Sequence, residues 1–235
     1  MPVDLQALTL DWTDFEKAGA ESRAFLRELV EDKALLRELV YRIEDRPDLL
    51  AMCERHQLLD YIVVEDALDR GFRLRIHLST QDHLDRPHDH RFSFSSLIVT
   101  GGYEHTWHHP VRALYDASGA DDTAVRHQSV NAPDLRDEVG LGDLVPYVTR
   151  REEPGACYTL HHSTIHTTFT TPDTVSIFLR GPAEKDRSII FDRETGRLWW
   201  RYGQQAEPEE RRRSKPMSLE EYREFRTRLE KLGVI

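Results

Sequence analysis

Cysteines and long apolar runs are scarce in this sequence of 235 residues. Its two cysteines, Cys53 and Cys157, cannot build a disulfide framework and do not form a CxxC metal site. No segment approaches the run of about eighteen apolar residues that a membrane-spanning helix needs. The first residues carry acidic side chains where a signal peptide would carry basic ones. We therefore expect a cytoplasmic protein with no membrane partner.

Excess positive charge is also missing, since the formal net charge is -10 at pH 7. This balance disfavours binding to a phosphate backbone. The short basic run Arg211, Arg212 and Arg213 is flanked by glutamates and is interpreted as a solvated linker face. Phosphate loops, dinucleotide fingerprints and serine hydrolase elbows are absent, because the glycines lack the required spacing. Nucleic acid is not an expected partner, and those three classes are set aside.

The chain is long enough for one substantial β domain with helical additions. Residues 1–56 repeat apolar side chains at intervals of three and four, which predicts two or three short helices packed on that domain. Residues 57–205 are predicted to form the β domain, and residues 206–235 a linker and a C-terminal helix. That helix should begin with a capping box, Ser218 and Glu221, and stop at Gly233.

Short strands are predicted throughout residues 57–205. After Gly71 the sequence FRLRIHLS alternates apolar with polar side chains, so one face of this strand carries Arg73, Arg75 and His77. A polar face fits either solvent or an internal cavity. Further strands are predicted over residues 61–64, 91–99, 103–108, 111–115, 156–160, 164–170, 174–179, 188–192 and 198–202. Many short strands predict a barrel or a sandwich, and residues 116–149 are predicted to be a long inserted loop with room for one strand.

Ten of the twelve histidines fall in two windows, seven from His77 to His109 and three from His161 to His166. Neutral imidazole is the usual nitrogen ligand of iron, zinc, copper, nickel and manganese. His88 and His90 are two residues apart, so a strand would place both rings on one face, close enough to share an ion. The clustering therefore predicts a metal site.

These residues resemble the two metal-binding motifs of the cupin family. In the first, DHLDRPHDHRFSFSSLIVTGG, His88 and His90 match the histidines, and Ser95 stands at the acidic position. In the second, GACYTLHHSTIHTTFT, His166 matches the histidine. The second motif departs from the family at the proline, glycine and asparagine positions, which hold His161, Ser163 and Thr170. The resemblance covers residues 71–182 except the inserted loop, and implies a mainly β cupin jelly-roll barrel with N-terminal helices and a C-terminal helix.

The resemblance implies one divalent transition metal held by His88, His90 and His166. The missing glutamate leaves three neutral ligands, a set similar to that of cysteine dioxygenase and other thiol dioxygenases. Such a set leaves coordination positions open, which suits iron(II), the favoured metal, and also zinc(II). A dication with neutral ligands keeps its full charge and favours anionic substrates. Whether His161 or His162 takes part is left open.

The same resemblance places a carboxylate-binding arginine on the strand before the first motif, where Arg73 and Arg75 are both candidates. Arg180 stands near the position of the cysteine dioxygenase active-site tyrosine, so that tyrosine is unmatched, which argues against cysteine as the substrate. The candidate catalytic residues are Arg75, Tyr103 and Tyr158, and the candidate substrate-binding residues are Arg73, Arg75, Arg180 and His105.

The expected function is a non-haem iron(II), cysteine-dioxygenase-like oxygenase that acts on a small carboxylate-bearing or amino-acid-derived molecule, with dioxygen as its second partner. One alternative is a zinc, nickel or manganese cupin that catalyses a lyase, isomerase or bond-forming step. Another is a cupin that binds metal or ligand without turnover. The sequence does not separate these, because a three-histidine site binds several metals. A homodimer is left open.

Overall fold

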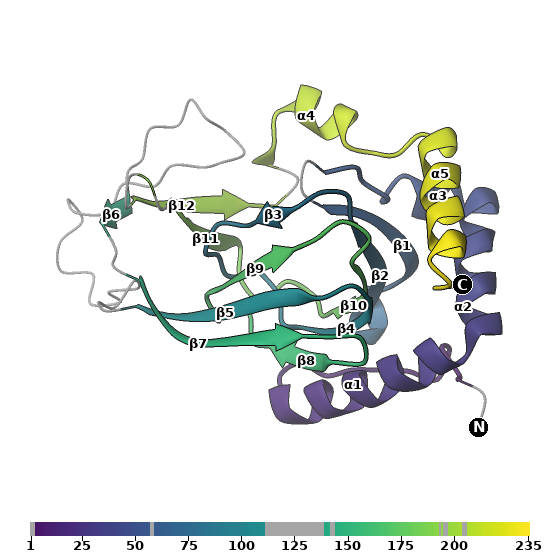
Figure 1. Cartoon of the computed structure of the whole chain (residues 1–235), viewed down its shortest axis with the longest axis horizontal. Helices are drawn as coiled ribbons and strands as arrows, with labels where there is room; N and C mark the ends of the chain where they lie inside the picture. Colours follow the sequence, from purple (N-terminus) through teal and green to yellow (C-terminus); the bar gives the residue numbers. More distant parts are fainter. Residues whose placement is uncertain are drawn as a thin grey trace.

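The computed structural model describes residues 3–56, 59–110, 139–141, 144–192, 194, 197–203 and 206–235. The helical elements are α1 (Phe15–Glu31), α2 (Lys33–Tyr41), η1 (Arg42–Asp45), α3 (Pro47–Leu50), η2 (Leu68–Arg70), α4 (Glu209–Ser214) and α5 (Leu219–Lys231). The strands are β1 (Leu59–Ala67), β2 (Phe72–Ser79), β3 (His83–Leu84), β4 (Phe94–Thr100), β5 (Tyr103–Pro110), β6 (Val139–Leu141), β7 (Leu144–Glu152), β8 (Cys157–Leu160), β9 (His166–Thr170), β10 (Val175–Arg180), β11 (Arg187–Phe191) and β12 (Arg197–Tyr202). The predicted fold class, mainly β with helices at both ends, is confirmed (Figure 1).

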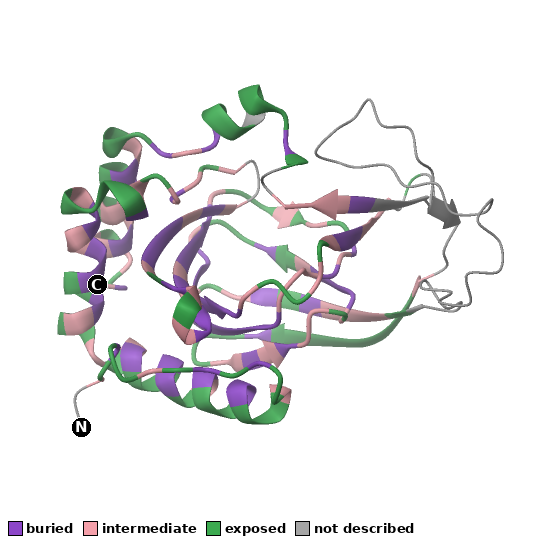
Figure 2. Ribbon diagram, turned by 180° about the vertical axis from the view of Figure 1, so that it is seen from behind, coloured by how far each residue is buried: buried purple, intermediate pink, exposed green. Residues whose placement is uncertain are grey.

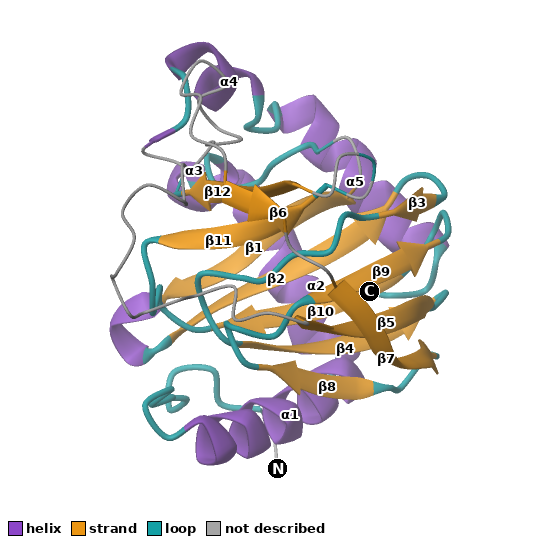
Figure 3. Cartoon of the chain, turned by 90° about the vertical axis from the view of Figure 1, so that its left-hand side faces the viewer, coloured by secondary structure: helices purple, strands orange, loops and turns teal. Residues whose placement is uncertain are grey.

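The strands form three antiparallel sheets, in the orders β1-β2-β10-β4-β8, β3-β9-β5-β7 and β11-β12-β6. Figure 3 shows the four-stranded sheet facing the five-stranded one. In the part of the chain that the structure describes, the sheets are not closed into a barrel, because each of them ends at two edges. The alternation of polar and apolar residues does not distinguish a closed barrel from two facing sheets, because both arrangements show it.

Two apolar cores lie on opposite faces of the five-stranded sheet. The outer face carries Leu74 and Ile76 of β2 and Ile177 of β10, which pack in the large core with the terminal helices. α1 lies against β4 and β8, while α2 and α3 lie against β1. Figure 2 shows the resulting stripe along α1, buried on one side and exposed on the other. The inner face contributes Phe94 and Phe178 to a smaller core between the sheets.

The C-terminal helix begins as predicted. The Ser218 hydroxyl accepts a hydrogen bond from the Glu221 backbone N–H, and the Glu221 carboxylate accepts one from the Ser218 N–H. Three residues of α5, Tyr222, Phe225 and Leu229, are buried in the large core with α1 and α2. The helix therefore completes the outer layer rather than the space between the sheets.

Most of the predicted inserted loop lies outside the described residues. The described parts of this segment belong to strands. β7 pairs along its length with β5, and β6 pairs with β12. Nearly all of β7 is exposed on both faces, so its sequence shows no alternation from which a strand could be predicted. None of the described helices combines the length and the apolar character that a membrane span requires.

Candidate metal centre

Backbone hydrogen bonds place the three candidate metal ligands side by side. His88 and His90 lie on the segment between β3 and β4, and His166 is the first residue of β9. The His88 N–H donates to the His166 carbonyl at 3.0 Å, and the His166 N–H donates back at 2.9 Å. On the other side of the segment, the Asp89 N–H donates to the Ile189 carbonyl of β11 at 3.1 Å. The HxH segment is thus fixed between two sheets.

One ligand atom of each of His88, His90 and His166 lies within 4.8 Å of the other two. The His90 and His166 Nε2 atoms are 2.8 Å apart. Two histidine nitrogens on adjacent octahedral positions, each 2.0 to 2.1 Å from a metal, would be about 3.0 Å apart. The ring nitrogens therefore fit a first-row divalent ion without rebuilding of the backbone.

Burial keeps the His90 and His166 rings in the neutral form that binds metal. It lowers the pKa of His90 and of His166 well below the ordinary histidine value, and neighbouring His88 lowers both further. His88 is more accessible, with a side chain that is 23% exposed. Its Nδ1 lies 2.7 Å from the Arg86 carbonyl and can donate to it, which leaves Nε2 for the metal. The accessible edge of the site is at His88.

A buried chain of polar groups stands behind His166. His166 Nδ1 lies 2.8 Å from His105 Nε2, and His105 Nδ1 lies 3.7 Å from Glu152 Oε1. Arg150 pairs with that carboxylate through Nε at 2.8 Å and through Nη2 at 2.9 Å. Burial would raise the pKa of Glu152, but its contacts with His105 and Arg150 lower it overall. The nearby Glu152 carboxylate favours the His105 tautomer that carries its N–H on Nδ1, and in that tautomer His105 Nε2 accepts a hydrogen bond from the His166 Nδ1–H.

His105, which the sequence predicted to bind substrate, lies instead behind the candidate ligand His166. Its side chain is fully buried and its ring stacks on Trp107 at 4.0 Å. Glu152 was not among the predicted site residues, because it lies at the end of β7, a strand that the sequence pattern did not predict. The position of this acidic residue, shortly before the histidine window from His161 to His166, was the signal that could have drawn attention to it.

The two arginines that the sequence left equivalent have different surroundings. Arg73 forms two hydrogen bonds with Asp66 of β1, at 2.8 and 2.9 Å. Arg75 has no carboxylate partner among the described residues, and its guanidinium lies 4.4 Å from the centre of the Tyr61 ring. Arg180 is likewise without a described carboxylate partner and lies 4.6 Å from the Phe92 ring centre. Of these, Arg75 and Arg180 remain available to an anion.

Both candidate tyrosines are buried in the core between the sheets. The Tyr103 hydroxyl donates to Ser176 Oγ at 2.7 Å, and burial raises the pKa of Tyr103 to about 12. Burial also raises the pKa of Tyr158 well above its ordinary value, and the Tyr158 hydroxyl contacts Ser96. Both phenols are therefore protonated at neutral pH and are engaged by serines.

Ser95, which the motif alignment placed at the acidic ligand position, faces away from the histidines. Its hydroxyl lies 2.7 Å from Ser22 of α1 and 2.7 Å from Thr159 of β8. The neighbouring Phe94 is the residue that points inward, where its ring lies 4.7 Å from that of His90. The inward-facing residue of β4 is thus Phe94, one position before the residue that the motif alignment predicted. Among the described residues, the candidate ligand set of His88, His90 and His166 contains no carboxylate.

His161 and His162 belong to a different group. Together with Glu184 they bring one ligand atom each within 4.8 Å of the others. His162 Nδ1 lies 2.9 Å from a Glu184 oxygen, and His161 Nδ1 lies 2.8 Å from Ser163 Oγ. The structure thus separates these two histidines from His88, His90 and His166.

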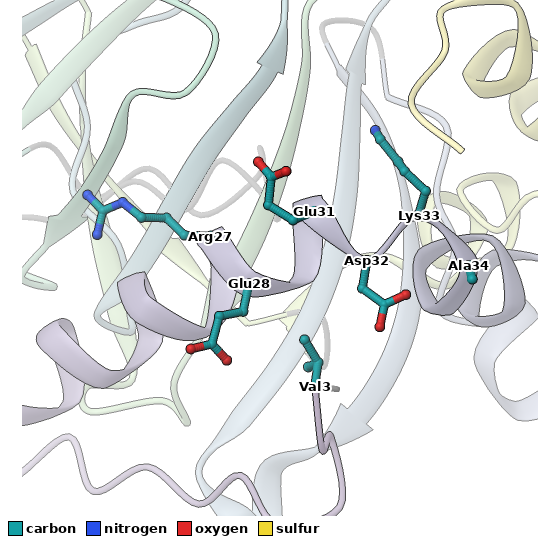
Figure 4. Close-up of a pocket in the computed structure, with 7 residues that line it drawn as sticks. All are labelled: Val3, Arg27, Glu28, Glu31, Asp32, Lys33 and Ala34. Carbon is teal, nitrogen blue, oxygen red and sulfur yellow. The ribbon is translucent and has the colours of Figure 1, made fainter. Parts of the chain in front are cut away.

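A surface depression on the helical side of the molecule is drawn in Figure 4. It is lined by Val3, Arg27, Glu28, Glu31, Asp32, Lys33 and Ala34. Its charges are mixed and its lining includes no histidine or cysteine. It lies at the junction of α1 and α2, outside the space between the sheets, and plays no part in the candidate site.

No family model matches this sequence, and no curated protein matches it. Solved structures give distant likenesses. The chain is similar to KdgF from Halomonas sp., with 15% identity over 57% of this chain and 88% of that one, at a TM-score of 0.35. It is also similar to an RmlC-like cupin from Shewanella frigidimarina, with 11% identity over 57% and 98% of the two chains, at 0.34. A third likeness is to the DMSP lyase DddQ from Ruegeria pomeroyi, with 9% identity over 57% and 51%, at 0.33.

Proposed function

We propose that this protein is a metal-dependent cupin enzyme, a non-haem iron(II) oxygenase that acts on a small carboxylate-bearing or amino-acid-derived substrate. The observation that carries the proposal is the group of His88, His90 and His166, whose ligand atoms lie within 4.8 Å of one another. Three neutral nitrogen ligands with no carboxylate fit an ion that must also bind an anionic substrate. Bound iron(II) would supply a dication with open positions and one-electron chemistry with dioxygen.

The protein's own side chains have separate tasks in this proposal. His105 holds the ring of His166 and fixes its tautomer, so that Nε2 faces the metal. Phe94 packs against His90 and limits water on the inner side of the site. Arg75 is the arginine that binds the substrate carboxylate, because Arg73 is already occupied by Asp66.

The test starts with elemental analysis of the purified protein. It continues with anaerobic reconstitution by iron(II) and dioxygen-uptake assays against a panel of small amino, hydroxy and thiol acids. Near-stoichiometric iron and substrate-dependent uptake are expected. Tightly held zinc, nickel or manganese without uptake would overturn the oxygenase and support a non-redox lyase, isomerase or bond-forming enzyme. Bound metal with no turnover of any kind would support a binding protein, and absence of metal would end the metalloenzyme proposal.

A further inference from the structure

The inner side of the molecule carries four arginines that no described carboxylate neutralises. Arg75 on β2 and Arg180 on β10 lie on the inner face of the five-stranded sheet, since Arg75 pairs with Phe178 and Arg180 with Phe94. Arg91 directly follows the HxH segment, and Arg201 lies on β12. The Arg91 guanidinium lies beside the backbone of Gly203, two residues after Arg201, and both Arg91 and Arg180 interact electrostatically with Arg75. We call Arg75, Arg91, Arg180 and Arg201 the arginine cluster.

The carboxylates near the arginine cluster are engaged elsewhere. Asp66 forms two hydrogen bonds with Arg73, and both Glu207 oxygens lie 2.5 Å from Lys215 Nζ. Glu54 hydrogen-bonds to the Tyr61 hydroxyl. The cluster is therefore a local excess of positive charge inside a protein whose formal net charge is -10.

Burial makes this excess unfavourable in the absence of an anion. The Arg180 residue is 8% exposed, and its only described hydrogen bond runs to the Gly181 carbonyl at 3.2 Å. The Nε atoms of Arg75 and of Arg180 are both buried without a hydrogen-bond partner. Burial and the neighbouring arginines lower the pKa of Arg180 to about 9. Buried charges and buried N–H donors without partners are costly, and a bound anion would satisfy both.

Two lines of aromatic rings connect the cluster with the histidines. Arg180 lies over Phe92, whose ring centre is 5.7 Å from that of His90. From Arg75 the other line runs through rings 4.4 to 5.8 Å apart and ends at His90; its members are Tyr61, His77, Phe178 and Phe94. Arg201 and His77 also lie within electrostatic range of His90. Packed rings therefore link the buried arginines Arg75 and Arg180 to His90, a candidate metal ligand.

We propose that the arginine cluster is a binding site for an anion with at least two negative charges, such as a dicarboxylate or a phosphate ester. Guanidinium groups bind carboxylate and phosphate oxygens through paired N–H donors. A single carboxylate would pair with one guanidinium group and leave the positive charges of the other arginines without a counter-ion. The cluster therefore favours an anion that carries a second oxyanion group. That this anion is the substrate of the metal site rests on the proposed function, whereas its binding to the arginines does not.

The test is calorimetric titration of the purified protein, at low ionic strength, with succinate, inorganic phosphate and acetate as probes. Succinate or phosphate is expected to bind at least tenfold more tightly than acetate, and the tighter of the two identifies the oxyanion class. Arg180→Gln and Arg75→Gln should each weaken that binding at least tenfold. Arg223→Gln, an exposed arginine of α5 that is paired with Glu44 far from the cluster, is the control and should change it less than threefold.

Two further measurements, of thermal unfolding and of anion binding without the metal, test the anion site. Arg180→Met removes a buried charge, so without an anion its midpoint of thermal unfolding should equal or exceed that of the wild type, while phosphate and succinate no longer raise it. His90→Ala protein should lose its metal and still prefer the dianions, and wild-type protein that binds the dianions but holds no metal would overturn the proposed function alone. Equal affinity for acetate and the dianions, no binding of any probe, or unchanged binding in Arg180→Gln would overturn the arginine cluster as an anion site.

Discussion

The two faces of strand β2 show how this protein divides stability from chemistry. Leu74 and Ile76 point outward into the large core that the terminal helices cover, and both are fully buried. Arg75 and His77, on the alternate positions, point between the sheets toward the candidate metal centre. One strand with a period of two thus serves both tasks. Changes on the outer face should affect folding alone, and changes on the inner face should affect metal, anion and proton binding.

The largest expected effect concerns the metal ligands of the inner side. His166→Ala should remove stoichiometric metal from the purified protein, because it deletes the most buried of the three ligands. Metal content by elemental analysis, with circular dichroism to verify folding, measures it. His161→Ala is the control and should retain the metal, since that residue belongs to the group with Glu184. The opposite pattern would move the third ligand to His161.

On the outer face, Ile76→Ala should lower the free energy of unfolding by about 2 to 5 kcal/mol, because it opens a cavity in a close-packed core. Chemical denaturation measures this effect. Leu84→Ala, whose side chain is largely exposed, should change stability by less than about 0.5 kcal/mol. The division between the faces fails if folded Ile76→Ala protein has lost its metal.

Behind the ligands, His105→Phe should weaken metal binding about 10- to 100-fold without removing it. Phenylalanine keeps the stack on Trp107 but leaves the His166 Nδ1–H without its acceptor. Competition with a chelator of known affinity measures the change. His109→Phe, an exposed position on the same strand, serves as the control. Equal affinities in the two variants would reduce His105 to a packing residue.

The smallest expected effect is a pH dependence from His77, whose pKa burial lowers to about 3. Above the ordinary histidine pKa of about 6.5 neither state is protonated, so His77 has no effect there. Between 6.5 and about 3 the unfolded chain takes up a proton that the folded protein excludes, so stability falls as pH falls, by about 1.4 kcal/mol per pH unit. His77→Phe should show a shallower decline in metal-free urea unfolding between pH 6 and 4. An unchanged slope would indicate that His77 is protonated in the folded state.

Much of this arrangement follows from local sequence patterns. The alternation in β2 predicted its polar face, and the capping box at Ser218 predicted the start of α5. The two histidine motifs predicted that His88, His90 and His166 would meet, and the structure brings them together. These features depend on residues close in sequence or on a motif pair whose spacing is fixed by the fold.

Other features depend on strand register, which the sequence does not reveal. A bulge between Val63 and Glu65 shifts β1 so that Asp66 lies opposite Arg73, and this pairing distinguishes Arg73 from Arg75. The parity of β4, which turns Ser95 toward α1, depends likewise on the start of the strand. The pairing of β2 with β10 and the approach of Arg201 to His90 both join residues that lie far apart in the sequence.

The most direct test of the account is an anaerobic titration of metal-free protein with iron(II), followed by calorimetry, on the wild type and on His90→Ala. We predict close to one equivalent of tightly bound iron in the wild type and none at the same site in the variant. No binding by the wild type, or the same stoichiometry and affinity in His90→Ala, would contradict the assignment of His88, His90 and His166 as a metal centre.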